Sequence, residues 1–263
     1  MKVLVLAHGV LGFGAPHFLL FNQYLNKLKY FSCVSAAINQ NVLKVLEPHS
    51  YTIGTVQVRA DKLAELILEN TSLNDEVYIV AHSMGGLDAR FLLKQNSAVR
   101  DRVVALVTIG TPHEGSRVAD AIITAGPGEN IPEKILKFLP SKAQGLLDLT
   151  TEACAKFNVT YVDQPGITYY AIAGNALAGN KFSSLLKLAS RVGHIENVPS
   201  DGVVTVESAE RKGWIILPRW PVDHLAQIGW HWDYLFNSSE HIERYLKLIS
   251  HVTRISYEQL KKI

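Results

Sequence analysis

The chain has 263 residues, 48% of them hydrophobic, and its 26 Lys and Arg residues nearly balance 24 Asp and Glu residues. This composition supports a large buried core and excludes disordered and fibrous chains. The formal net charge of +2 argues against a dedicated nucleic-acid-binding protein, which would carry a basic face. No uncharged apolar run of about 18 residues occurs, so no transmembrane segment is expected.

The first residues predict a buried strand. Met1–Ala7 is apolar apart from Lys2, but the run is too short for a signal peptide and leads directly into His8 and Gly9. If the natural gene begins here, the product is cytoplasmic; if a signal peptide is missing, it is secreted. The two cysteines, Cys33 and Cys154, are expected to be unpaired, buried thiols.

Strand and helix patterns alternate through the first half of the chain. Apolar runs predict buried strands, and apolar residues three and four apart predict helices. We expect strands at 3–7, 42–46, 77–81 and 103–109, with helices at 17–30, around 63–67 and from 85 onward. This alternation is typical of a mostly parallel sheet with helices on both faces and right-handed crossovers.

The second half contains two excursions from this pattern. Residues 116–150 hold amphipathic helical pieces, which predict a lid or cap insertion; a structural helical pair on the rim is the alternative. Strands are expected at 167–174 and 214–218, a helix around 182–188 and a closing helix from 239. We therefore expect one domain, 1–263, with the insertion at 116–150 within it.

A strand, a sharp turn and a helix meet at Ser83. Small residues, Ala81 and Gly85, lie two positions before and after this serine, where the strand and helix backbones pass closely. Such a turn exposes the serine hydroxyl at the end of the sheet, next to a helix N-terminus that favours negative charge. Ser83 is thus a candidate acyl nucleophile; the alternative is a plain Ser-Gly turn.

A serine nucleophile needs a base and an acid that follow later strands in the chain. His224, seven residues after Leu217, is the best-placed base. The expected acid is Asp201, with Asp163 and Glu207 as weaker rivals. The acid would accept the imidazole Nδ1 hydrogen, and the base would take the serine proton.

Two backbone N–H groups would form the oxyanion hole. One is expected from Met84, the residue after the nucleophile. The other is expected from the glycine-rich loop after the first strand, most simply from Val10. The alternative for this loop is a tight turn without a functional role.

Five motifs, taken in order, resemble those of the bacterial true lipases of the α/β-hydrolase superfamily. They are His8–Phe13, Ala81–Gly86, Gly110–Ser116, Leu149–Asn158 and Ser200–Val204. The resemblance implies an α/β-hydrolase fold, the triad Ser83, Asp201 and His224, oxyanion donors at Val10 and Met84, and a lid after Ser116. It also implies a structural calcium held partly by an acidic residue that Ala226 replaces here, which argues against that ion.

The sequence therefore predicts a carboxylic ester hydrolase, a lipase or esterase, that needs no cofactor. Its expected partners are a small-molecule or lipid ester and, transiently, a lipid interface. A non-catalytic binding protein of the same fold is the alternative from another class. Hydrolysis of a thioester, polyester or amide bond is a further alternative.

Overall fold

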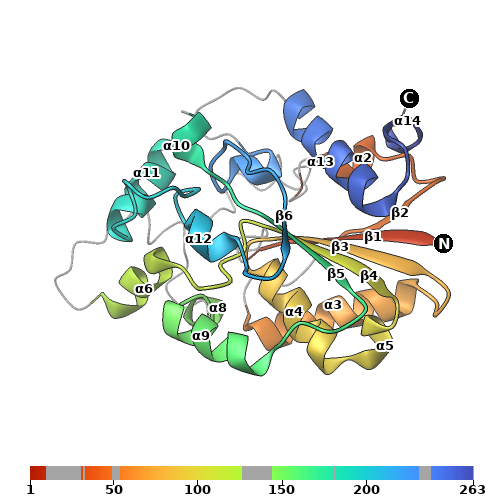
Figure 1. The fold of residues 1–263 in the computed structure, drawn as a ribbon, viewed down its shortest axis with the longest axis horizontal. Coiled ribbons are helices and arrows are strands. Elements are labelled where there is room, and N and C mark those ends of the chain that lie inside the picture. Colours follow the sequence, from red (N-terminus) through yellow and green to blue (C-terminus); the bar gives the residue numbers. More distant parts are fainter. Residues whose placement is uncertain are drawn as a thin grey trace, which may run out of the picture.

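The computed structural model describes residues 1–9, 31, 33–48, 54–125, 144–179, 182–230 and 238–262. Six strands form one sheet in the order β2-β1-β3-β4-β5-β6, and every pair of neighbours is parallel (Figure 1). The strands are β1 (Lys2–Ala7), β2 (Lys44–Leu46), β3 (Glu76–His82), β4 (Val103–Ile109), β5 (Thr168–Ile172) and β6 (Ile215–Ile216). This confirms the predicted parallel α/β architecture.

Two layers of helices cover the sheet. The helices are α2 (Val34–Ala37), α3 (Val56–Asn70), α4 (Gly85–Gln95), α5 (Ser97–Arg100), α6 (Arg117–Thr124), α8 (Gln144–Leu147), α9 (Thr151–Thr160), α10 (Ala176–Gly179), α11 (Ser184–Val192), α12 (Val206–Ala209), α13 (Ser238–Thr253) and α14 (Tyr257–Leu260), with a short 3-10 helix, η2 (Ala226–Ile228). In Figure 1, α3, α4 and α5 lie on one face, and α2, α13 and α14 lie on the other.

Alternation along the strands divides the core between these faces. Successive side chains of a strand point to opposite sides of the sheet, so Val3 and Val5 pack with α3 and α4, whereas Leu4 and Leu6 pack with α13. All four side chains are fully buried. The continuous apolar sequence of β1 is explained by burial on both faces.

Most helices begin after a side chain that caps the first free N–H groups. Each such cap contributes about 1 kcal/mol to stability. The capping residues are Thr55, Asn96, Ser116, Thr150, Ser183, Thr205 and Ser256. These caps set where the helices start around the sheet.

Several predicted boundaries differ from the structure. The strand predicted at 42–46 begins at Lys44, because the N–H groups of Val42 and Leu43 bond to the Asn39 carbonyl in a turn. The last strand is only Ile215–Ile216. Both of its side chains are exposed, as suits the edge of the sheet.

The predicted helix at 17–30 and most of the predicted lid lie outside the described residues. At the ends of the lid segment, α6 and α8 are helical, as predicted. Both cysteines are unpaired, as expected, but Cys33 is exposed, so the prediction of two buried thiols was wrong for it. Cys33 lies at the start of α2 with φ 65°, where the chain turns at the surface. Of the helices described, none combines the length and apolar character needed to cross a membrane.

Candidate active site

Ser83 lies in the turn between β3 and α4. Its φ of 56° is in the left-handed region, which is uncommon for a residue with a side chain. Two contacts with the neighbouring strand and loop hold this backbone: the Ser83 N–H donates to the Ile109 carbonyl at 2.9 Å, and the Thr111 hydroxyl donates to the Ser83 carbonyl at 2.8 Å. The turn is therefore fixed from the β4 side.

The small residues of this turn are required by close backbone packing. A Cβ atom on Gly85 would lie 2.6 Å from the carbonyl oxygen of Ala7, and one on Gly86 would lie 2.2 Å from the Thr111 hydroxyl oxygen. Neither distance is compatible with a side chain. The N-terminus of α4 thus packs directly against the end of β1, as expected for a nucleophile turn.

The loop after β6 brings His224 to the serine. An isolated parallel bridge between Gly174 and Trp220 extends the β5–β6 pairing toward this loop. The Nε2 atom of His224 lies 3.0 Å from the Ser83 Oγ atom. Both residues are less than a tenth exposed. This is hydrogen-bond distance between a hydroxyl and a base.

Asp201 lies on the other side of the same imidazole. Its Oδ2 atom is 2.7 Å from His224 Nδ1. The backbone N–H of His224 also donates to the backbone carbonyl of Asp201 at 2.9 Å. The Oδ1 atom accepts the N–H groups of Val203 and Val204 at 3.0 and 2.8 Å. Because the carboxylate is anchored by backbone donors, its second oxygen is held toward the imidazole.

The rival acids lie elsewhere. Asp163 accepts a hydrogen bond from the Trp214 indole at 2.7 Å and pairs with Arg211. Glu207 is exposed on α12. The adjacent Asp223 accepts the N–H groups of Ser183 and Ala226, each at 2.9 Å, and so points away from the imidazole of its neighbour. The structure therefore brings Asp201, of the predicted candidates, to His224.

Of the two predicted oxyanion donors, Met84 and Val10, the structure describes only Met84. Met84 is the N-cap of α4, and its side chain is fully buried. Among the described residues, no backbone carbonyl accepts a hydrogen bond from the Met84 N–H. Val10 lies outside the described residues. Its role stays a prediction.

The sequence reading missed a second set of residues behind the imidazole. Gln227 donates from Nε2 to Asp201 Oδ2 at 2.9 Å, and its Oε1 atom lies 3.0 Å from His82 Nε2. The His82 and His224 rings lie 4.5 Å apart. Burial, and next the nearby His224, lower the pKa of His82 well below its usual value, so His82 is neutral. No motif in the sequence marks Gln227 and His82, although His82 precedes Ser83 and Gln227 follows His224 by three residues.

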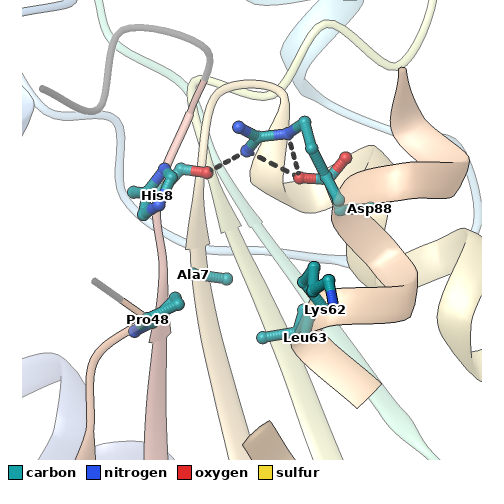
Figure 2. A pocket seen from close by; sticks show the side chains of 7 residues that line it. Ala7, His8, Pro48, Lys62, Leu63 and Asp88 are labelled. Carbon is teal, nitrogen blue, oxygen red and sulfur yellow. Dashed lines mark hydrogen bonds and ion pairs between the residues drawn. The ribbon is translucent and has the colours of Figure 1, made fainter. Parts of the chain in front are cut away.

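A buried ion pair, also missed, links the first loop to the nucleophile helix (Figure 2). Arg59 of α3 bonds to Asp88 of α4 through Nε at 2.8 Å, and its Nη2 donates to the His8 carbonyl at 2.5 Å. Burial raises the pKa of Asp88 to about 6, although Arg59 opposes this. These residues line a small pocket of about 20 Å³, room for about one water molecule. The pair holds the entry of the predicted oxyanion loop against α4.

The expectation that no calcium binds near His224 stays a prediction, and two described residues bear on it. Ala226 offers no side-chain oxygen, and the Asp223 carboxylate already accepts two backbone N–H groups. Calcium requires six to eight oxygen ligands. Across the described ranges, no group of three or more His, Cys, Asp or Glu side chains is arranged to hold a metal. No step below is routed through a metal.

In sequence, the chain is similar to one domain family and to two proteins named as triacylglycerol lipases. Residues 22–125 match the model of the PGAP1-like alpha/beta domain. Triacylglycerol lipase 2 of Saccharomyces cerevisiae is 26% identical over 222 residues, which cover 80% of this chain and 65% of the yeast protein. A triacylglycerol lipase of Vibrio cholerae is 25% identical over 261 residues, covering 86% of this chain and 79% of that one. The chain thus spans less than two thirds of the yeast relative.

The fold is similar to that of a solved lipase structure. The crystal structure of Staphylococcus hyicus lipase superposes with a TM-score of 0.72 at 17% identity, covering 98% of this chain and 96% of that one. At this identity the likeness concerns the fold, and it extends over nearly the whole of both chains. The chain therefore has the α/β-hydrolase fold that this lipase structure shows.

Proposed function

We propose that this protein is a serine hydrolase that cleaves carboxylic esters of lipids through an acyl-enzyme, with Ser83, His224 and Asp201 as its catalytic triad. One observation carries the proposal: Ser83 Oγ lies 3.0 Å from His224 Nε2, and His224 Nδ1 lies 2.7 Å from Asp201 Oδ2. A non-catalytic binding protein would have no need of this continuous path from hydroxyl to carboxylate.

The path determines where each proton goes. A carboxylate only accepts hydrogen bonds, so Asp201 holds the hydrogen on His224 Nδ1 and leaves the Nε2 lone pair facing the serine. As Ser83 Oγ attacks the ester carbonyl carbon, His224 takes the hydroxyl proton. The imidazolium then gives this proton to the departing alkoxide. An alcohol leaves, and the acyl group stays on Ser83 as an ester.

Water completes the cycle. His224 takes a proton from a water molecule that attacks the acyl carbonyl, and Ser83 Oγ leaves with that proton as the carboxylic acid is released. The Met84 N–H, at the positive end of the 11-residue helix α4, is the proposed donor to the oxyanion in both steps. Val10 is the proposed second donor.

The names of two similar proteins, both triacylglycerol lipases, support a lipid acyl group as the substrate group. We assign residues 116–150 to a lid over the acyl chain. At the described ends of this segment, Ile123 is 38% and Leu147 is 51% exposed, which leaves apolar surface for an acyl chain to contact. The same apolar residues would provide the transient contact with a lipid interface.

Labelling with a fluorophosphonate tests the nucleophile. We expect covalent modification of Ser83 in the wild type, and loss of both labelling and ester hydrolysis in Ser83→Ala. Ser72→Ala is the matched control, because Ser72 is a surface serine bonded to Asp75 before β3. Full ester cleavage by Ser83→Ala, or a wild type without label, would contradict the proposal and favour the binding protein.

Substrate preference is measured on the same protein. A series of nitrophenyl esters of increasing acyl length, together with emulsified triglyceride, separates the lipase from the esterase. A rate that rises sharply when triglyceride exceeds its solubility supports the lid. Turnover of soluble esters without such a rise supports an esterase and contradicts the lid.

A further inference from the structure

We propose that Gln227 is a positioning residue of the hydrolytic site, whose side-chain amide holds the Asp201 carboxylate for His224 and fixes His82 beside the His224 ring. The proposal rests on the function proposed above, since it concerns the same triad. Among the described residues, the side-chain amide of Gln227 bonds to Asp201 and His82 rather than to Ser83. Its effect must therefore pass through Asp201 and His82.

The carboxylate determines how the amide is oriented. Asp201 Oδ2 only accepts hydrogen bonds, so the group 2.9 Å away is the amide nitrogen of Gln227. The amide oxygen consequently faces His82 Nε2 at 3.0 Å, which places a hydrogen on that nitrogen. One amide thus bonds both to the Asp201 carboxylate and to His82, whose ring also bonds to the backbone of His224.

The space around this amide is closed on two sides by glycines. A Cβ atom on Gly110 would lie 2.2 Å from Gln227 Oε1, and one on Gly174 would lie 2.0 Å from Nε2. Gly110 follows β4 and Gly174 lies just after β5, so the amide fits between the ends of two central strands. Gln227 is fully buried. The fit leaves little room for another orientation of the side chain.

The backbone of Gln227 is anchored separately from its side chain. The N–H bonds to the Asp223 carbonyl at 3.1 Å, and the carbonyl accepts the Tyr245 hydroxyl of α13 at 3.0 Å. A substitution at 227 that keeps the size of the side chain therefore preserves these links. The role of the amide is separable from the stability of η2.

The amide also matters during the reaction. When His224 becomes an imidazolium, the Asp201 carboxylate stabilises its charge, and a second donor on Oδ2 keeps that oxygen in place. His82 donates its Nε2 hydrogen to the amide oxygen of Gln227. It stays neutral beside the His224 imidazolium. Without the amide, the two N–H groups on Oδ1 still anchor the carboxylate, but Oδ2 keeps only the imidazole as a partner and holds the His224 ring less firmly.

The test uses two near-isosteric substitutions. Gln227→Met keeps the volume and removes both hydrogen bonds, and we expect kcat/KM to fall about ten- to hundred-fold, almost entirely in kcat. Fluorophosphonate labelling of Ser83 should slow by a similar factor. Val99→Ala is the control for a general loss of packing, because Val99 is fully buried in α5, before the start of β4; it should leave kcat/KM unchanged.

Gln227→Glu gives a readout that a merely structural role would not move. The neutral carboxylic acid reproduces the amide, since its O–H donates to Asp201 and its C=O accepts from His82. The ionised form faces Asp201 as a like charge. The groups around it are Asp201, His82 and His224, with Tyr245 from α13 and His241 acting on His82. Burial and the Asp201 carboxylate raise the pKa of the new carboxyl.

We therefore expect the ratio of Gln227→Glu to wild-type kcat/KM to fall as pH rises from 5 to 9. A ratio that does not change with pH, or a Gln227→Met enzyme within two-fold of wild type, would overturn this inference alone. Thermal unfolding of each variant verifies that it is folded. An inactive wild type, or an active Ser83→Ala variant, would overturn the proposed function as well. The Ser83→Ala measurement therefore distinguishes failure of the proposed function from failure of this inference alone.

Discussion

Two buried hydroxyl–imidazole pairs in the described part of the chain differ in the group behind the imidazole. In the first, Ser83 faces His224, and the Asp201 carboxylate lies behind. In the second, the Thr108 hydroxyl lies 3.0 Å from His113 Nε2, and the guanidinium of Arg90 lies 3.4 Å from His113 Nδ1. The two pairs are similar in geometry and opposite in the charge of the third group.

That charge decides which nitrogen carries the hydrogen. A guanidinium only donates, so His113 Nδ1 accepts from Arg90 and its hydrogen lies on Nε2, pointing at Thr108. The Thr108 hydroxyl accepts this hydrogen and donates to the Tyr170 carbonyl at 3.3 Å. His113 thus has no lone pair with which to take a proton from threonine. Behind His224 the carboxylate produces the opposite tautomer.

The surroundings of the second pair explain its role. Arg90 also bonds to Asn158 at 2.9 Å and to the Tyr161 carbonyl at 3.1 Å, which ties α4 to α9. Burial, and next Arg90, lower the pKa of His113 well below its usual value. The Arg90 network is therefore a structural link. A hydroxyl beside a buried histidine is not by itself a site of catalysis.

The largest expected difference between the pairs comes from removing each imidazole. His224→Ala should lower kcat for ester hydrolysis by about 10⁴- to 10⁶-fold, because Ser83 loses its base. His113→Ala should keep kcat/KM within about three-fold and instead lower the free energy of unfolding by about 1–3 kcal/mol, since Thr108 and Arg90 lose a buried partner. Steady-state kinetics and urea unfolding measure both. Comparable loss of activity in the two variants would break the comparison.

Removing the charge of each acid gives the next effect. Asp201→Asn should lower kcat by about 10⁴-fold, because the amide can hold His224 in the wrong tautomer. Asp163→Asn should change kcat/KM by no more than about three-fold, since Asp163 pairs with Arg90 and Arg211 rather than with the triad. The kinetics of both variants at one pH are sufficient. A strong effect of Asp163→Asn would return it to the list of candidate acids.

The smallest effect is on the pH dependence of stability. The pKa of His113 is lower in the folded chain than its unfolded value of 6.5, so the unfolded chain binds a proton that the folded chain does not. Stability is fully present above about pH 6.5 and is lost as pH falls below it, by about 1.4 kcal/mol per pH unit for each such histidine.

Urea unfolding between pH 5 and 8 measures this slope. His82 contributes in the same direction as His113, because its pKa is also lowered by burial. His113→Ala should therefore reduce the acid-side slope by about one proton without abolishing it. An unchanged slope would mean that His113 titrates alike in the folded and unfolded chain, contrary to its burial beside Arg90.

Local sequence determined the elements and pointed to the proposed nucleophile. The apolar runs of β1, β3 and β4 predict strands buried on both faces, and the small residues around Ser83 predict a close strand-to-helix turn. Both depend on neighbouring residues and on short-range sterics, so they can be read from a few positions. The boundaries of β2 and β6 could not be read in this way. A turn at Asn39 shortens β2, and β6 is short because it lies at the edge of the sheet.

The assembly of the site required the tertiary structure. Ser83 and His224 are separated by 141 positions, and only the convergence of the strand ends brings them within 3.0 Å. The same convergence excludes Asp163 and brings in Gln227 and His82, which no local pattern marks. Whether a buried histidine faces a carboxylate or a guanidinium depends on packing between distant elements, and that choice separates the proposed triad from the Arg90 network.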